Sequence, residues 1–372
     1  MHTQIECLRT GSTGCGEGSW VLHDVGPRHV LASHSSPSLT PTAHVIQVPD
    51  MSASKENLPQ GSGVTAERSW QLTGRESAGA KLVEGISWEV VQVQAPDDEG
   101  VGGLYDAILL DPPSAIQEGL EGVLAAEAEA EAEAAQRPKL PLIAYPHGGP
   151  HSNMGTEHYA SVALLVLQGF SVLLVNFRGS TGYGQGPLES LFGNVGRKDV
   201  DDVKAAVTHV LATRAHLDAA RVGACGGSHG GFLSLHLVGQ FPELFRAAAV
   251  RNPVTNIATM YGATDIPDWC YTETGSTPAY AQPTAEQYAR ALRMSPMAYV
   301  SKIVAPVLLL VGGDDRRVPP FQSKEFFYAL RERVGDKVEM LWYDKHTHGL
   351  QETPKGEGDG LTNICYFFKR HL

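Results

Sequence analysis

The sequence has few cysteines, no long apolar run and no excess of basic residues, and each lack argues against a class of protein. Its five cysteines among 372 residues are scattered and odd in number, which is unlike a disulfide framework and favours a reducing compartment. No apolar run reaches the roughly 20 residues of a membrane-spanning helix. Residues 1–6 show no basic segment leading into an apolar core. We therefore expect no secretory signal, no membrane partner and a cytoplasmic location.

Acidic residues outnumber basic ones, with 41 Asp and Glu against 29 Lys and Arg and a formal net charge of −12. No basic stripe is visible, so we expect no nucleic-acid partner. Part of the acidity is local, because residues 115–137 contain an alternating Ala-Glu tract. Alanine and glutamate favour helix, but glutamates four residues apart repel each other. We predict a solvated, partly helical insertion there, and an acidic recognition tail is the alternative.

The run Gly-Gly-Ser-His-Gly-Gly over residues 226–231 is the centre of the functional pattern. Apolar residues 221–225 before it predict a strand, and residues 232–237 after it predict a helix. A serine on so tight a strand-to-helix turn needs neighbours without side chains, which the glycines provide. We expect Ser228 to be a nucleophile, with the helix N-terminus facing the developing oxyanion. The motif alone also occurs in unrelated loops, so its flanks and downstream partners decide its meaning.

Candidates for an acid and a base follow downstream. Residues 306–313 predict a buried strand that leads into Asp314 and Asp315, and residues 338–343 predict a strand that leads towards His346 and His348. Because parallel strands end at one edge of a sheet, these side chains would meet Ser228 there. The order Ser, Asp, His is that of α/β-hydrolase triads. By spacing alone the two aspartates are nearly equivalent.

Seven motifs in order, spread over about residues 105–372, resemble the catalytic domain of the acylaminoacyl-peptidase (acylpeptide hydrolase) group in the prolyl oligopeptidase family. Together they are far more specific than any one of them. The motifs lie at residues 146–151, 176–184, 226–231, 251–254, 265–270, 315–319 and 347–348.

The resemblance implies an α/β-hydrolase fold, with a mostly parallel sheet flanked by helices. It also implies a serine peptidase that releases an N-acylated, typically N-acetylated, amino acid from the amino terminus of short peptides. It favours Asp315 because the family's acid directly precedes Arg-Arg-Val-Pro, and His348 because it completes a Thr-His pair before Gly349. His346 departs from the family, which has a small residue at that position.

Four further residues are candidates for contacts with substrate. Backbone N–H groups of Gly149 and His229 are predicted to form an oxyanion hole, with Gly148 as the alternative to Gly149. Arg178 and Arg251 follow predicted strands and could bind a peptide carbonyl or carboxylate, although an ordinary structural ion pair is an equal alternative for each.

Two other features of the sequence bear on the site. Residues 257–296 contain no long periodic helix, and they are predicted to form either a lid-like insertion or plain packing. Metal binding by His346, His348 and nearby acids is another alternative. No His-Glu-x-x-His motif or cysteine pair accompanies these histidines, so we expect no metal and no cofactor.

The predicted domains are an incomplete β-propeller remnant at residues 1–95 and an α/β-hydrolase catalytic domain at residues 96–372. Enzymes of the resembled family carry a propeller before the hydrolase domain. A propeller needs at least four blades of about 40 residues each, which residues 1–95 cannot supply. We therefore favour a fragment or isoform over a poorly ordered front end.

Two rival functions stay open. A general carboxylesterase would use the same three residues and would turn over esters much faster than acyl-amino-acid amides. An inactive fragment that binds or assembles with full-length subunits is suggested by the missing propeller. The sequence leaves open the P1 and acyl-group preferences and whether the chain forms a homo-oligomer.

Overall fold

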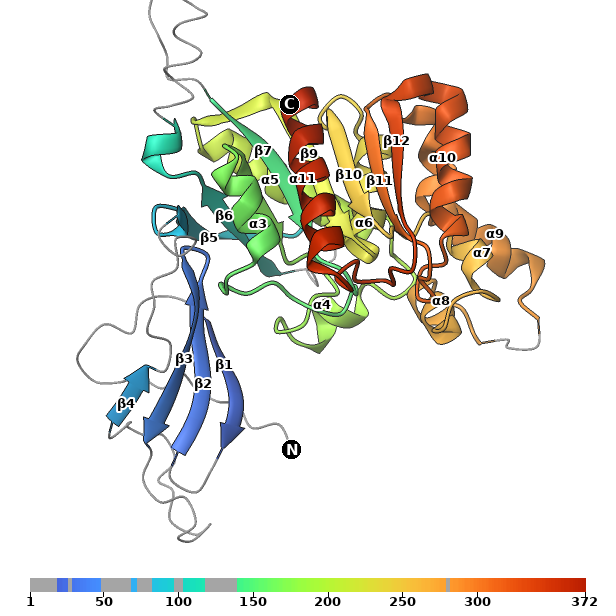
Figure 1. Cartoon of the computed structure of the whole chain (residues 1–372). Helices are drawn as coiled ribbons and strands as arrows, with labels where there is room; N and C mark the ends of the chain where they lie inside the picture. The colour runs from blue at the N-terminus through green and yellow to red at the C-terminus, as the bar shows by residue number, and fades with distance from the viewer. Residues whose placement is uncertain are drawn as a thin grey trace, which may run out of the picture. The chain divides into compact units, whose positions relative to one another are not determined.

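A computed structural model describes residues 19–25, 29–47, 68–71, 82–96, 103–117, 139–278 and 282–372 (Figure 1). Two compact units divide the chain: residues 1–87 with 155–163, and residues 88–154 with 164–372. The strand that begins near Trp88 therefore belongs to the second unit, whereas the sequence placed the boundary after residue 95. From residue 118 onward, the predicted acidic insertion lies outside the described residues.

The first unit contains one antiparallel sheet whose strands pair in chain order. Its strands are β1 (Ser19–Val25), β2 (His29–Ser36), β3 (Leu39–Gln47) and β4 (Arg68–Gln71). Four antiparallel strands are what one propeller blade contains. The origin of this sheet as a propeller remnant stays a prediction.

The second unit is built on an eight-stranded sheet in the order β12-β11-β10-β9-β7-β8-β6-β5. Pairing from β12 to β8 is parallel, and β6 runs antiparallel to β8. The strands are β5 (Ser87–Gln94), β6 (Leu104–Asp111), β7 (Leu140–Pro146), β8 (Ser171–Val175), β9 (Leu217–Gly227), β10 (Ala247–Arg251), β11 (Val307–Gly312) and β12 (Val338–Tyr343).

Helices separate most of these strands along the chain. They are α3 (Ala160–Leu167), α4 (Gln185–Glu189), α5 (Lys198–Thr213), α6 (His229–Gln240), α7 (Ile257–Met260), α8 (Pro267–Glu273), α9 (Ala285–Arg293), α10 (Phe321–Val334) and α11 (Pro354–His371), with short 3₁₀ turns η1 (Pro296–Lys302) and η2 (Gly335–Lys337). Residues 257–296, in which the sequence showed no long helix, form three short ones. Among the described residues, no helix is long and apolar enough to cross a membrane.

The central strands are covered on both faces, which confirms the predicted fold class. Helix α11 packs against β10 and β11 on one face of the sheet, and helices α5 and α6 pack together on the other face (Figure 1). Every residue of β7, β8 and β11 is buried, as expected for parallel strands between two helical layers. The sequence shows this burial as unbroken apolar runs.

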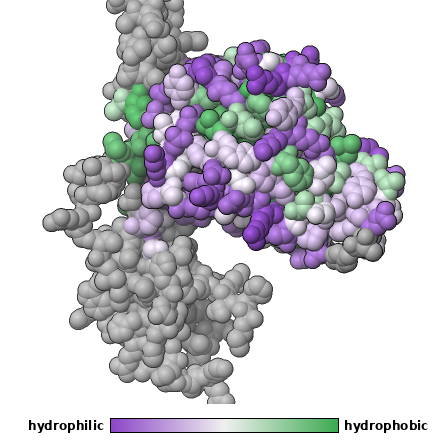
Figure 2. Space-filling view, turned by 45° about the vertical axis from the view of Figure 1, so that its right-hand side comes forward, coloured by the Kyte–Doolittle hydropathy of each residue, from purple (hydrophilic) through white to green (hydrophobic). Residues whose placement is uncertain are grey.

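The surface of the second unit is mixed in character. Figure 2 shows hydrophilic residues over much of the visible face, with hydrophobic residues in scattered patches. Large apolar side chains that are well exposed include Tyr328 and Tyr366. Single exposed apolar residues of this kind are normal for a folded protein. The functional candidates lie at the edge of the sheet where the parallel strands β9 to β12 end.

Candidate active site

Ser228 lies in a strained turn between β9 and α6. Its φ of 57° and ψ of −122° put it in a region that residues with a side chain rarely adopt. The glycines beside it are required by space, because a Cβ on Gly230 would overlap the carbonyl oxygen of Pro146. The N–H of Ser228 donates to the carbonyl of Arg251, the last residue of β10, at 3.0 Å. The turn therefore has the geometry of a nucleophile elbow.

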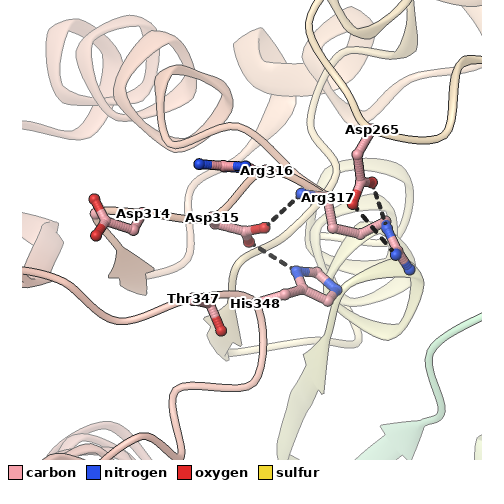
Figure 3. Close-up of a pocket in the computed structure, with 8 residues that line it drawn as sticks. Asp265, Asp314, Asp315, Arg316, Arg317, Thr347 and His348 are labelled. Carbon is pink, nitrogen blue, oxygen red and sulfur yellow. Dashed lines mark hydrogen bonds and ion pairs between the residues drawn. The ribbon is translucent and has the colours of Figure 1, made fainter.

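Asp315 and His348 meet at the carboxyl ends of β11 and β12. His348 Nδ1 lies 2.7 Å from Asp315 Oδ2 (Figure 3). The other carboxylate oxygen, Oδ1, accepts the backbone N–H groups of Arg317 and Val318 at 2.9 and 3.0 Å. Asp315 is 3% exposed, so these bonds supply the contacts that a buried carboxylate needs. The imidazole stays half-buried, and within the described part of the chain its Nε2 makes no hydrogen bond.

The neighbouring acid and histidine lie elsewhere. Asp314 is exposed, and its side chain points away from His348 (Figure 3). His346 turns towards the start of α11, with Nδ1 3.0 Å from the carbonyl of Asp344 and Nε2 3.3 Å from Thr353 Oγ1. Of the four candidates, the structure thus brings Asp315 and His348 together. Within the described residues, no group of three or more His, Cys, Asp or Glu is arranged to hold a metal ion.

Asn252 links the serine turn to the acid and histidine loops, a role that the sequence did not assign. It follows Arg251, whose carbonyl holds the N–H of Ser228. Its Oδ1 accepts the N–H of Gly312 at 2.8 Å, at the end of β11. Its Nδ2 donates to the carbonyls of Thr347 and His348 at 3.2 and 2.9 Å. The signal in the sequence for this role is the Arg-Asn-Pro motif directly after β10.

No hydrogen bond joins Ser228 and His348 within the described residues, although Asn252 ties their segments together. Catalytic hydrogen bonds are often long in the absence of substrate and tighten when it binds. The half-buried exposure of both residues leaves them accessible to a substrate.

The glycine loop after β7 lies directly beside Ser228. A Cβ on Gly148 would lie 3.3 Å from the carbonyl oxygen of Gly227, which is tight, and 3.5 Å from Ser228 Cβ, which is an ordinary contact. Gly149 has a φ of 120°, and its carbonyl accepts Trp269 Nε1 at 3.1 Å. Burial lowers the pKa of His147 to about 4, which keeps this imidazole neutral. Gly149 and Gly148 both remain candidates for the first oxyanion donor.

Helix α8 braces the same loop from the segment that was predicted to form either a lid-like insertion or plain packing. Besides the bond from Trp269, His151 Nε2 lies 3.1 Å from Glu273 Oε1. Its Nδ1 lies 2.8 Å from the carbonyl of Gly179. The hydrogen bond with Glu273 raises the pKa of His151. Trp269 and Glu273 therefore tie the glycine loop to α8.

Of the two alternatives that the sequence left open for Arg178, the structure shows the structural ion pair. The Arg178 guanidinium is buried and bonds both oxygens of Asp202, at 2.8 and 2.7 Å. Arg251 pairs in register with Gly227, on the sheet face where Gly223 meets Phe368 of α11, and its Nη2 reaches Tyr145 Oη at 3.4 Å. Neither arginine is among the residues that line the cavity beside His348. The sequence placed both at strand ends correctly but could not show which way they turn.

A cavity of about 700 Å³ opens beside the imidazole. Asp265, from the segment after α7, forms an ion pair with Arg317 at its rim, with Nε and Oδ1 2.6 Å apart (Figure 3). Both side chains of this pair are nearly half-exposed. The lining residues are Asp265, Gly313, Asp314, Asp315, Arg316, Arg317, Thr347 and His348. The pocket is large enough for a short peptide segment.

Sequence comparison finds relatives with one recurring description. The model of the prolyl oligopeptidase family matches residues 157–372. The acylamino-acid-releasing enzyme of Homo sapiens is 39% identical over the whole of this chain, and that of Arabidopsis thaliana is 39% identical over 80% of it. The chain covers 46% and 40% of these two proteins. It therefore spans less than half the length of these relatives.

Solved structures show a related fold. A Pyrococcus horikoshii acylaminoacyl peptidase superposes with a TM-score of 0.72 at 21% identity, over 92% of this chain and 48% of that chain. A puromycin hydrolase superposes with a TM-score of 0.73 at 21% identity, over 96% of this chain and 48% of that chain. At this level of identity the likeness concerns the fold.

Proposed function

Since the chain belongs to the prolyl oligopeptidase family, we propose that it is a serine peptidase in which Ser228, His348 and Asp315 are the catalytic residues. The observation that carries the proposal is the 2.7 Å contact of His348 with Asp315 at the sheet edge that also holds the strained Ser228 turn. The catalytic part would be the second unit. The four-stranded sheet of the first unit would be the remnant of a propeller.

The proposed reaction passes through an acyl-enzyme. The carboxylate of Asp315 accepts the Nδ1–H of His348, which leaves Nε2 as the base. His348 takes the Oγ proton of Ser228 as Oγ attacks the substrate carbonyl, and it then gives that proton to the leaving amine. Water, activated by His348, releases the acyl group and restores the serine. The N–H groups of Gly149 and His229 are the proposed donors to the oxyanion.

The proposed substrates are short peptides with an N-acylated, typically N-acetylated, amino terminus. This preference is supported by the seven motifs and by the relatives, which are described as acylamino-acid-releasing enzymes. The pocket beside His348 would receive part of such a peptide. A cytoplasmic location is also proposed, supported by the three buried free cysteines of the described residues, Cys225, Cys270 and Cys365.

The test compares hydrolysis of acetyl-alanyl p-nitroanilide, free alanyl p-nitroanilide and p-nitrophenyl butyrate by the purified chain. Faster cleavage of the acetylated amide than of the free one, lost in Ser228→Ala, is the expected result. Ser190→Ala is the matched control, because the hydroxyl of the half-buried Ser190, among the described residues, donates only to the carbonyl of Pro187 in its own turn. A folded chain with no Ser228-dependent turnover would contradict the proposal, and turnover of the ester alone would favour a carboxylesterase.

A further inference from the structure

The residue directly after the proposed nucleophile has a side chain that the reaction scheme does not use. His229 is fully buried, although Ser228 before it is only half-buried. Its ring stacks on Phe232 at a centroid distance of 4.8 Å and meets Trp269 edge-on at 6.0 Å. Its Nε2 lies 2.9 Å from Asp199 Oδ2, on α5. The imidazole is therefore enclosed by aromatic rings and bonded to one carboxylate.

That carboxylate is the ring's polar anchor. Among the described residues, Nδ1 of His229 is buried without a hydrogen-bond partner, so the bond at Nε2 sets how the ring is turned. Asp199 is fully buried in the first turn of α5, where the helix dipole stabilises negative charge. Its Oδ1 accepts the N–H of Val200 at 2.9 Å. Both oxygens of Asp199 are thus occupied, and the carboxylate cannot easily turn away from His229.

The position of the His229 ring bears on the backbone between residues 228 and 229. The ψ of Ser228, −122°, sets the plane of the peptide that carries the His229 N–H. A strained conformation of this kind persists only where surrounding contacts enforce it. One such contact is the bond from the Ser228 N–H to Arg251. The bond between His229 and Asp199 ties the next residue to α5.

We infer that Asp199 is a positioning residue, which acts through the His229 side chain to aim the His229 N–H at the oxyanion. The inference rests on the proposed function, because it takes Ser228 as the nucleophile and the His229 N–H as an oxyanion donor. An oxyanion donor contributes when it points at the place where charge develops in the transition state. Loss of the Asp199 bond should therefore slow the chemical step and leave substrate binding unchanged.

Asp202 provides a matched control one turn further along α5. It is also fully buried, and its carboxylate pairs with the Arg178 guanidinium. Its bonds hold the loop after β8 and do not touch residues 226–231. Asp199→Asn and Asp202→Asn therefore make the same chemical change, on the same helix and at the same burial. Only the first variant disturbs the residue next to the nucleophile.

The experiment measures kcat and KM for acetyl-alanyl p-nitroanilide and the affinity for acetyl-alaninal, an aldehyde that forms an oxyanion when serine adds to it. Removing an oxyanion donor outright costs about 10²- to 10³-fold in kcat, so a misdirected donor should cost about 10- to 100-fold. Asp199→Asn should lower kcat and aldehyde affinity by the same factor and leave KM unchanged. His229→Phe keeps the aromatic packing without the bond and should match it. The double variant should be no worse than either single variant.

Asp202→Asn should change kcat by less than about threefold even where it lowers the melting temperature as much as Asp199→Asn. Equal kcat losses in the two variants, or a loss of kcat without any loss of aldehyde affinity, would overturn the inference. His229→Gln, whose amide can still donate to Asp199, should recover part of the activity that His229→Phe loses. This rescue keeps the test decisive if Asp199→Asn does not fold.

Failure of the proposed function is recognised separately. A wild-type chain that cleaves no acetylated amide but reacts with a fluorophosphonate at Ser228 would refute the peptidase proposal. The ratio of fluorophosphonate rates between Asp199→Asn and Asp202→Asn would then test the positioning inference, because the phosphoryl oxygen uses the same donors. A wild-type chain whose Ser228 does not react at all would overturn both.

Discussion

The serine turn and the loops that carry Asp315 and His348 are held in place in different ways. Around Ser228, backbone packs on backbone, and an added Cβ at Gly226 or Gly230 would overlap main-chain atoms. Asp315 and His348 lie on loops at the pocket, and side-chain hydrogen bonds from Asn252 hold them. Substitutions in the turn should therefore damage the fold first. Substitutions in the loops should damage the chemistry first.

Asp315→Asn should have the largest effect of these substitutions, and the effect should be on kcat. Asparagine keeps the size of the side chain and can still accept from the loop N–H groups. It no longer holds the His348 tautomer that leaves Nε2 as the base. We expect kcat to fall about 10⁴-fold, or about 5 kcal/mol in the activation barrier. Asp314→Asn, at the exposed neighbour, is the control, and an equal loss of kcat there would refute the assignment of Asp315.

Gly230→Ala should show the opposite pattern, with a loss of stability that comes before any kinetic effect. Its Cβ would overlap the carbonyl oxygen of Pro146 and crowd that of His147. Overpacking against backbone that cannot yield should cost about 3 kcal/mol of unfolding free energy or more. Gly358→Ala, at an open site on the exposed face of α11, should be neutral or stabilising by up to about 1 kcal/mol. Urea unfolding of both variants would measure the two changes in unfolding free energy. Equal changes would contradict the prediction.

Low pH should lower the free energy of unfolding through a buried histidine on α6, the helix that follows Ser228. His236 Nε2 lies 3.1 Å from the Met294 carbonyl and Nδ1 2.9 Å from Gln240 Nε2, and burial lowers the pKa of His236 to about 4. Between that pH and about 6.5 the unfolded chain binds more protons, so stability rises with pH over this window. His236 should contribute about 3 kcal/mol of this rise. His236→Gln should flatten the urea-unfolding profile between pH 4 and about 6.5, and an unchanged slope would contradict the assignment.

Asn252→Gly tests the loop side while keeping a residue that tolerates the positive φ of 41°. It removes three hydrogen bonds and should cost about 2 kcal/mol of stability. It should also lower kcat about 10-fold by loosening His348. Gln322→Ala is the matched control, because this buried amide bonds the backbone at Thr255 and Asn256, away from the pocket. A similar fall in kcat for both variants would show that Asn252 matters only for stability.

Arg317→Gln should have the smallest effect on stability. Its ion pair with Asp265 is nearly half-exposed on both sides, and surface pairs of this kind contribute under about 1 kcal/mol. Asp265→Asn should give the same small change in stability. The hydrogen bond with Arg317 lowers the pKa of Asp265, but solvent screens this exposed pair and keeps its contribution small. Thermal melts at low and high salt would measure the contribution of this ion pair to stability. A larger loss would mean that the segment after α7 depends on this pair.

The sequence made much of the architecture predictable. Unbroken apolar runs marked the buried parallel strands, and glycines on both sides of Ser228 marked a turn whose backbone has no room for side chains. The resemblance to the family also favoured Asp315 and His348, which the structure brings into contact. The strand burial and the tight turn depend on local pattern, which carries most of the information on such features.

Only the tertiary structure decided what each polar side chain contacts. Arg178 and Arg251 lie at strand ends as predicted, but Asp202 on α5 takes the first, and the second turns to the α11 face of the sheet. No pattern in the sequence predicted the contacts of Asn252, Asp199 and Glu273. Each acts on a segment far away along the chain, through a bond that no local pattern records. The sequence by itself determined the layers of the fold and the serine turn. The packing of helices against the loops decided which side chains reach the site, because the direction of a side chain beyond a strand end depends on its neighbours in space.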